Sequence, residues 1–130
     1  MMNYYDILRE LYVPEFGSIW KAPNCIWTSG FAHNGAEKGL HPSIVEKVLK
    51  DEITVRLVPG TSKNYRTGRC VYVVKMGDDE RISHFLIDLS MPYHIDELKK
   101  LDRGWNGVDD LNEEQKSRFN LQIMACRGTR

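Results

Sequence analysis

Hydrophobic and polar residues alternate along the middle of the chain in a pattern typical of β-strands. Residues 52–58 place aliphatic side chains on one face of an extended segment. The aliphatic residues of that face are Ile53, Val55 and Leu57. Residues 42–49 are also rich in β-branched side chains, and Lys50 with Asp51 can turn the chain between the two runs. The pattern therefore predicts a central β-hairpin whose second strand has one buried face.

Further short strands are expected on both sides of this hairpin. Residues 17–21, 70–76 and 81–88 are strand-like, and residues 25–28 continue or pair with the first of these. Polar or glycine-containing turns separate them at regular spacing. Such spacing favours a small β-barrel or sandwich over a parallel α/β sheet.

Two helices are expected at the ends of the chain. Apolar residues recur at helical spacing in residues 3–12, and Pro14 ends that run. Near the other end, Asn112 followed by two glutamates and Gln115 is a capping sequence, which predicts a closing helix over residues 112–124. A shorter helical spacing joins Ile95, Leu98 and Leu101. Together these elements predict a compact β-barrel with helical attachments.

Length and composition are those of one ordinary domain. The chain has 130 residues, 42% of them hydrophobic, and we expect a single domain over residues 1–130. The formal net charge is zero, so the overall electrostatic field of the molecule does not indicate binding to nucleic acid or to a membrane. Charge is nevertheless uneven, because residues 54–76 lack acidic side chains and residues 88–114 are rich in them. Solvated faces explain either segment taken alone.

The cysteines and the N-terminal segment indicate a cytoplasmic protein. Cys25, Cys70 and Cys126 are odd in number and widely spaced, which suggests neither a disulfide framework nor a zinc site. The first residues are charged and lack an apolar core, so they do not form a signal peptide. Nothing approaches the length of a membrane span. We therefore expect free thiols, no membrane association, no metal and no cofactor.

The flanks of the central hairpin gather the residues best suited to chemistry. His41 precedes the first strand, and Thr61, Ser62 and Lys63 follow the second. In an antiparallel hairpin the start of one strand lies beside the end of the next, so His41 and Thr61 should come close together.

Four short segments resemble the MazF/PemK family of toxin endoribonucleases. They occur in the family's order and cover roughly residues 16–124. The four segments are Gly17-Ser18-Ile19-Trp20, Lys38-Gly39-Leu40-His41-Pro42-Ser43-Ile44-Val45, Val58-Pro59-Gly60-Thr61-Ser62, and the acidic stretch 107–114. Each is short, and only the combination is specific.

The resemblance implies a fold, an activity and partners. It implies a mainly β fold, a small SH3-like β-barrel with a short N-terminal helix and a C-terminal helix. It also implies a cytoplasmic growth inhibitor that cleaves single-stranded RNA without metal, forms a homodimer and is inhibited by a cognate antitoxin protein. The sequence departs from the family at three points. His41 stands where the family has Arg, Ser18 replaces Asp, and Gly35-Ala36-Glu37 matches the family's Gly-x-Glu loosely.

Cleavage through the 2′-hydroxyl needs a base, an acid and donors for the developing phosphorane charge. We predict that His41, Thr61 and Ser62 are catalytic, since an imidazole exchanges protons near neutral pH and hydroxyls can bind a phosphate oxygen. The predicted RNA-binding residues supply positive charge or an aromatic or imidazole ring. They are Lys38, Lys63, Arg66, Arg69, Trp27, Tyr65 and His33.

Each of these residues also has a structural interpretation. His41 can be a surface or hydrogen-bonded imidazole before a proline, Thr61 and Ser62 can be turn residues, and the basic residues can form a solvated loop. His33 fits an incidental surface position. His84 alternates with Ile82 and Leu86, which favours a core histidine whose hydrogen bonds are satisfied.

Two other functions stay open. One is a non-catalytic module of the same fold that binds nucleic acid or protein, and the other is a toxin that poisons gyrase by contact, as the related CcdB fold does. An enzyme should place His41 in an open groove beside Thr61. A binding module need not.

Overall fold

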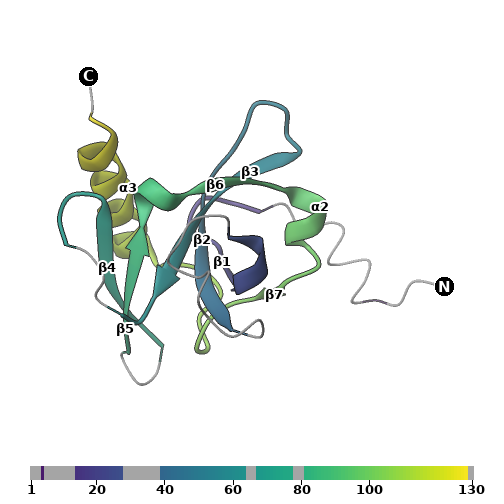
Figure 1. The fold of residues 1–130 in the computed structure, drawn as a ribbon, viewed down its shortest axis with the longest axis horizontal. Helices are drawn as coiled ribbons and strands as arrows, with labels where there is room; N and C mark the ends of the chain where they lie inside the picture. The colour runs from purple at the N-terminus through teal and green to yellow at the C-terminus, as the bar shows by residue number, and fades with distance from the viewer. Residues whose placement is uncertain (1–3, 5–13, 28–38, 64–66, 78–80, 129–130) are drawn as a thin grey trace.

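The computed structural model describes residues 4, 14–27, 39–63, 67–77 and 81–128. Over these residues the chain forms a seven-stranded antiparallel sheet and a C-terminal helix (Figure 1). The strands are β1 (Ile19–Pro23), β2 (Leu40–Val48), β3 (Thr54–Thr61), β4 (Val71–Met76), β5 (Arg81–Leu86), β6 (Met91–His94) and β7 (Asp102–Arg103). The helices are α2 (Ile95–Leu98) and α3 (Glu113–Arg127), with 3-10 turns η1 (Asn24–Ile26) and η2 (Ile87–Leu89).

Strand β3 is the branch point of the sheet. The strand order is β4-β5-β3-β2-β1-β7, and β6 also pairs with β3. The first half of β3 pairs with β6 from Thr54 to Leu57, and its last two residues, Gly60 and Thr61, pair with β5. Because β4 and β7 remain as edges within the described residues, the sheet is not a closed barrel. The expected mainly β fold with a C-terminal helix is confirmed, and the expected closure is not observed.

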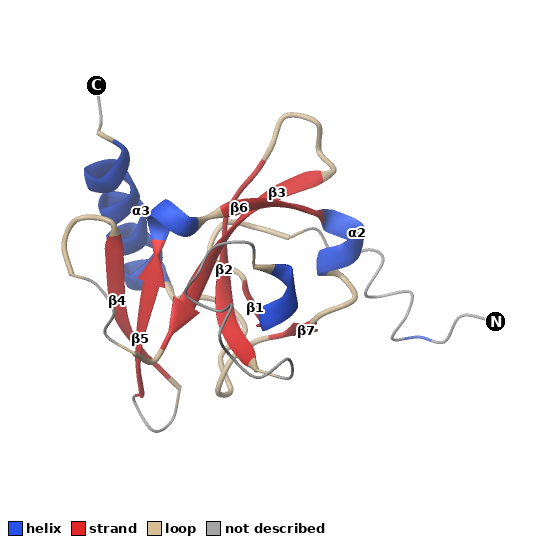
Figure 2. Cartoon of the chain, viewed as in Figure 1, coloured by secondary structure: helices blue, strands red, loops and turns tan. Residues whose placement is uncertain are grey.

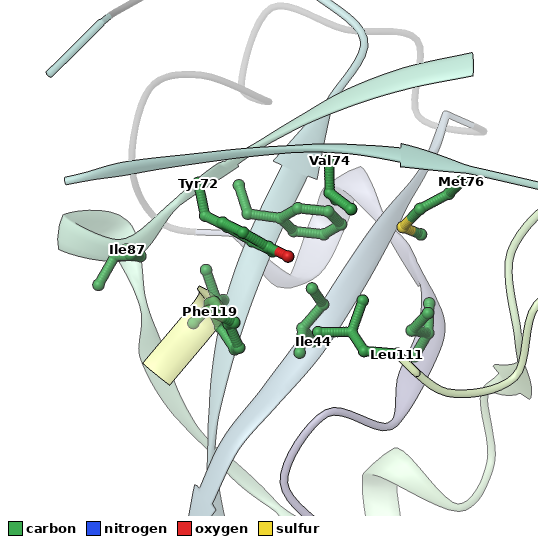
Figure 3. Packing of buried hydrophobic residues seen from close by; sticks show 10 residues of the cluster. Ile44, Tyr72, Val74, Met76, Ile87, Leu111 and Phe119 are labelled. Atoms are coloured by element: carbon green, nitrogen blue, oxygen red, sulfur yellow. The ribbon is translucent and has the colours of Figure 1, made fainter. Parts of the chain in front are cut away.

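One face of the sheet packs on α3. Phe119 of α3 is fully buried, and its ring centroid lies 5.1 Å from that of Tyr72 and 5.5 Å from that of Phe16. Figure 3 shows Phe119 and Tyr72 converging with Ile44 of β2. The Tyr72 hydroxyl donates a hydrogen bond to the carbonyl of Gln115 at 3.0 Å, so the aromatic contact is joined to a polar one.

The opposite face carries a second hydrophobic cluster. Its members come from strands β1, β2 and β3 and from the two short helical segments near them. They are Trp20, Ala22, Trp27, Val45, Val55, Leu57, Ile95 and Leu98. Because both faces are covered, the adjacent Leu57 and Val58 of β3 are both fully buried. The prediction of one buried face for the second strand of the hairpin is therefore wrong, and Ile53, expected on that face, lies before β3 and is 53% exposed.

Helix α3 begins where the sequence predicted. The side chain of Asn112 accepts from the backbone N–H of Gln115 at 2.8 Å, and Gln115 Oε1 accepts from the backbone N–H of Asn112 at 2.9 Å. This reciprocal capping box satisfies two of the donors left free at a helix start. The helix continues to Arg127, three residues beyond the expected end at 124. Figure 2 shows α3 as the long helix at one end of the sheet.

Several expected elements differ from the structure. Only Tyr4 of the expected helix at 3–12 lies within the described residues. Residues 25 and 26 of the expected strand at 25–28 lie in the 3-10 turn η1 instead, residue 28 lies outside the described residues, and the strand at 81–88 ends at Leu86. Strands β6 and β7 were not expected, because their four and two residues are too short to give a periodic pattern. No described helix is long and apolar enough to cross a membrane.

A disulfide joins Cys70, the residue before β4, to Cys126 in the last turn of α3. The two residues are 56 positions apart in sequence. A hydrogen bond of 2.6 Å from Gln122 Nε2 to the carbonyl of Arg69 lies beside this bridge. The expectation of free thiols is therefore wrong for these two cysteines, because the packing of α3 on β4 brings them together. Cys25 is free and exposed.

We expect the disulfide to stabilise the fold by closing a long loop in the unfolded chain. The double variant Cys70→Ser, Cys126→Ser should lose about 2–4 kcal/mol of unfolding free energy in the absence of reductant. Urea unfolding followed by tryptophan fluorescence measures this loss. Cys25→Ser is the matched control and should leave the midpoint unchanged. Equal midpoints for the double variant and the intact protein would contradict the stabilising role.

Candidate functional site

The central hairpin brings His41 beside the end of β3, where Thr61 lies. The antiparallel pairing of β2 with β3 ends with Ser43 opposite Pro59, and extending that register by two residues would place His41 opposite Thr61. The His41 imidazole also forms a hydrogen bond with the backbone of Gly60. The two predicted residues are therefore neighbours across the sheet.

Gly60 makes this close approach possible. A Cβ added there would lie 2.5 Å from a ring carbon of Phe85 and 2.9 Å from the carbonyl oxygen of Pro42. Distances this short leave no space for a side chain on this residue. The end of β3 is therefore held tightly between β2 and β5.

His41 is half-buried, and its surroundings change its protonation. Burial lowers the pKa of His41 below its ordinary value, and the hydrogen bond with the Gly60 backbone opposes part of that shift. The imidazole is therefore neutral near pH 7. A neutral imidazole has a lone pair that can accept a proton.

Thr61 and Ser62 occupy different environments. Thr61 is only 3% exposed, and its Oγ1 accepts a hydrogen bond of 3.2 Å from the backbone N–H of Lys63. The Thr61 hydroxyl therefore shapes the turn after β3, the role that the structural interpretation gave it. Ser62 and Lys63 are exposed on that turn and free of this burial.

The other predicted RNA-binding residues are dispersed. Trp27 is 2% exposed within the second hydrophobic cluster, where its ring is not available to stack on a base. Arg69 is exposed, but it precedes Cys70 and lies beside the last turns of α3. Four further predicted residues lie outside the described residues. They are His33, Lys38, Tyr65 and Arg66.

A third residue, His84, joins this region and was not predicted as part of it. His84 of β5 pairs directly with Thr61 of β3, so His41, Thr61 and His84 follow one another across three adjacent strands. We call these three residues the cross-strand row. Paired residues of antiparallel strands project to the same face, so all three side chains lie on one side of the sheet.

His84 does not fit the expected core position with satisfied hydrogen bonds. The residue is partly exposed, and its Nδ1 is buried without a hydrogen-bond partner. Its other neighbour in the sheet, Val73 of β4, is 53% exposed. The alternation of residues 82–86 predicts on which side of its strand His84 lies. Tertiary pairing decides which strands lie beside it.

Another buried hydroxyl lies on the same face. Ser43 is two residues from His41 along β2 and is fully buried, and its Oγ has no hydrogen-bond partner. Among the described residues, no three acidic, histidine or cysteine side chains are grouped as metal ligands.

A groove of about 660 Å³ lies elsewhere, between the end of β2 and α3. Its lining includes Phe16, Glu46 and Lys116. Arg127 also lines it and forms an ion pair of 2.7 Å with the buried Glu46 carboxylate. His41 does not line this groove, so the groove belongs to the packing of α3 and not to the cross-strand row.

Comparison with known proteins adds no family assignment. No protein-family model matches the chain, and no curated protein matches it either.

The lowered pKa of His41 predicts a pH dependence of stability. The ordinary pKa of a histidine is 6.5, and just below this pH the unfolded chain should bind more protons than the folded protein. The contribution of His41 to folding is therefore complete above pH 6.5 and is lost as the pH falls below it. NMR titration of the His41 ring should give a pKa below 6.5.

Urea unfolding at about pH 7.5 and about pH 5 tests the same linkage, since imidazoles titrate between these values. His41→Gln should reduce the loss of unfolding free energy on acidification. His94→Gln, at an exposed histidine, is the control for removal of an imidazole. A His41 pKa at or above 6.5 would contradict the predicted direction.

Proposed function

We propose that this chain is a toxin endoribonuclease that cleaves single-stranded RNA without a metal ion and inhibits growth. The observation that carries the proposal is the position of His41 beside the turn that presents Ser62 and Lys63. We propose further that the seven-stranded sheet is a variant of the SH3-like barrel of the MazF/PemK toxins, which the four sequence segments resemble.

The chemistry assigns a role to each group. Neutral His41 takes the proton of the 2′-hydroxyl, because its lowered pKa leaves the ring unprotonated near pH 7. The exposed Ser62 hydroxyl and Lys63 ammonium bind the phosphate whose charge grows in the transition state. Thr61 acts as a positioning residue, because its Oγ1 holds the backbone N–H of Lys63.

The proposed partners follow from the resemblance. They are single-stranded RNA, a second copy of the chain in a homodimer, and a cognate antitoxin protein. The exposed positive charge of Lys63 supports the first of these, because phosphate contacts dominate nucleic-acid affinity.

We also propose a cytoplasmic location, which the disulfide makes testable. Disulfides such as Cys70–Cys126 are rare in reducing compartments. Alkylation of thiols during cell lysis, followed by mass spectrometry, would show whether the two cysteines are reduced in the cell. A bridge that is oxidised in the cell would argue for an oxidising compartment instead.

A non-catalytic RNA-binding module is the second candidate. It is favoured by the 3% exposure of Thr61, the residue that the family resemblance makes catalytic. Its prediction is RNA binding without cleavage.

RNA cleavage tests the proposed activity directly. The purified protein should cut a mixed-sequence single-stranded RNA equally well with and without a chelator. His41→Ala should slow cleavage by about 10²–10⁴-fold, the usual contribution of a positioned acid or base, and should abolish growth arrest on expression. His94→Ala is the matched control. Cleavage retained by His41→Ala would remove His41 from the mechanism, and binding without cleavage by the intact protein would favour the module.

Lys63 should contribute to RNA affinity through charge. Lys63→Ala should weaken binding of single-stranded RNA and reduce the magnitude of the slope of log affinity against log salt by about 0.7. Lys50→Ala is the control, because Lys50 is exposed at the opposite end of the β2–β3 hairpin. Fluorescence anisotropy over a salt series measures both variants. Equal slopes for the two would place the RNA elsewhere on the surface.

A further inference from the structure

The cross-strand row contains a second imidazole, that of His84, and its position in the fold suggests a role in catalysis. Thr61 pairs with His84 of β5 on one side. On its other side, the β2–β3 register extended by two residues places it opposite His41. Adjacent strands are about 4.8 Å apart, so the backbones of the two histidines are about 10 Å apart on the same face. Two imidazoles on one face, with the central strand between them, can flank one phosphodiester group.

None of the described contacts explains His84 as a structural residue. Its Nδ1 is buried without a partner, whereas a histidine that only fills a core normally hydrogen-bonds its buried nitrogen. The residue remains partly exposed, and the paired Val73 on β4 is 53% exposed, so this part of the face is open to a ligand.

Positive charge lies on the same face nearby. Lys75 is two residues from Val73 along β4, so its side chain projects to the side of the sheet that carries His84, and it is exposed. Lys63 is exposed at the other end of the region, after β3. These two ammonium groups and the two imidazoles suit an anionic backbone that runs across β3 and β5.

We propose that His84 is a second catalytic residue, the general acid that protonates the leaving 5′-oxygen while His41 acts as the general base. This inference rests on the proposed ribonuclease function. It adds a residue that neither the sequence patterns nor the family resemblance assigned to the site.

The step balances without any co-reactant. His41 removes the proton of the 2′-hydroxyl, and the 2′-oxygen forms a bond to the adjacent phosphorus. The bond from phosphorus to the 5′-oxygen breaks, and protonated His84 gives its proton to that oxygen. The products are a 2′,3′-cyclic phosphate and a 5′-hydroxyl, and water then restores the two protonation states. Nothing is oxidised or reduced.

An RNA with sulfur in place of the bridging 5′-oxygen tests the role of His84. A thiol has a pKa of about 8.5, so the thiolate leaves without protonation by an acid. His84→Ala should slow cleavage of ordinary RNA by about 10²-fold or more. The same variant should cleave the 5′-sulfur RNA at nearly the rate of the intact protein. His41→Ala should be slow on both substrates, because the base is still needed.

Controls separate catalysis from folding and binding. His84→Asn keeps a polar side chain that cannot transfer a proton at neutral pH, so its cleavage should resemble that of His84→Ala. It replaces His84→Ala in the test if the alanine variant does not fold. His94→Ala should cleave both substrates normally. Circular dichroism and the urea midpoint establish that each variant is folded.

Each result decides the inference. Selective rescue by the 5′-sulfur substrate supports it, whereas equal losses on the two substrates would give His84 a binding or structural role and overturn it. Unchanged cleavage of ordinary RNA by both His84 variants would overturn it while the proposed function survives. If the intact protein cleaves neither RNA, both the function and this inference fail.

Discussion

The antiparallel pairing of β2 with β3 is the constraint on which the rest of the structure depends. Strand β1 adds to the outer side of β2, while β5 and β6 share the other side of β3. Both faces of the pair are covered by hydrophobic clusters, one beneath α3 and one around Trp20. A slip of one residue in this register would exchange the two clusters' side chains and move His41 away from Thr61.

The same pairing joins stability to the candidate chemistry. Gly60 lies so close to Phe85 and to the Pro42 carbonyl that no side chain fits there, and the His41 ring forms a hydrogen bond with the Gly60 backbone. The imidazole is consequently half-buried, which lowers its pKa and keeps it neutral. The rigid sheet supplies the position of the ring, and the exposed turn after Thr61 supplies groups that a ligand can reach.

Helix α3 is fastened to the sheet at both ends by different forces. The Asn112 capping box stabilises the helix start itself, and the Tyr72 hydrogen bond to the Gln115 carbonyl joins that first turn to the sheet. The last turn is held by the disulfide to Cys70 and the ion pair of Arg127 with Glu46. Phe119 fills the space between. These contacts cover the face opposite to the cross-strand row, so they support the site without entering it.

Local signals in the sequence determined the central hairpin, the strands β4 and β5, the start of α3 and the neighbouring positions of His41 and Thr61. Each depends on residues close in the chain, through side-chain alternation, turn composition or capping. Only the tertiary structure decided that His84 lies beside Thr61, that Cys70 meets Cys126, and that β2 and β3 are buried on both faces. Those features join segments far apart in sequence, and their partners are selected by packing of the whole sheet and helix, which no local pattern encodes.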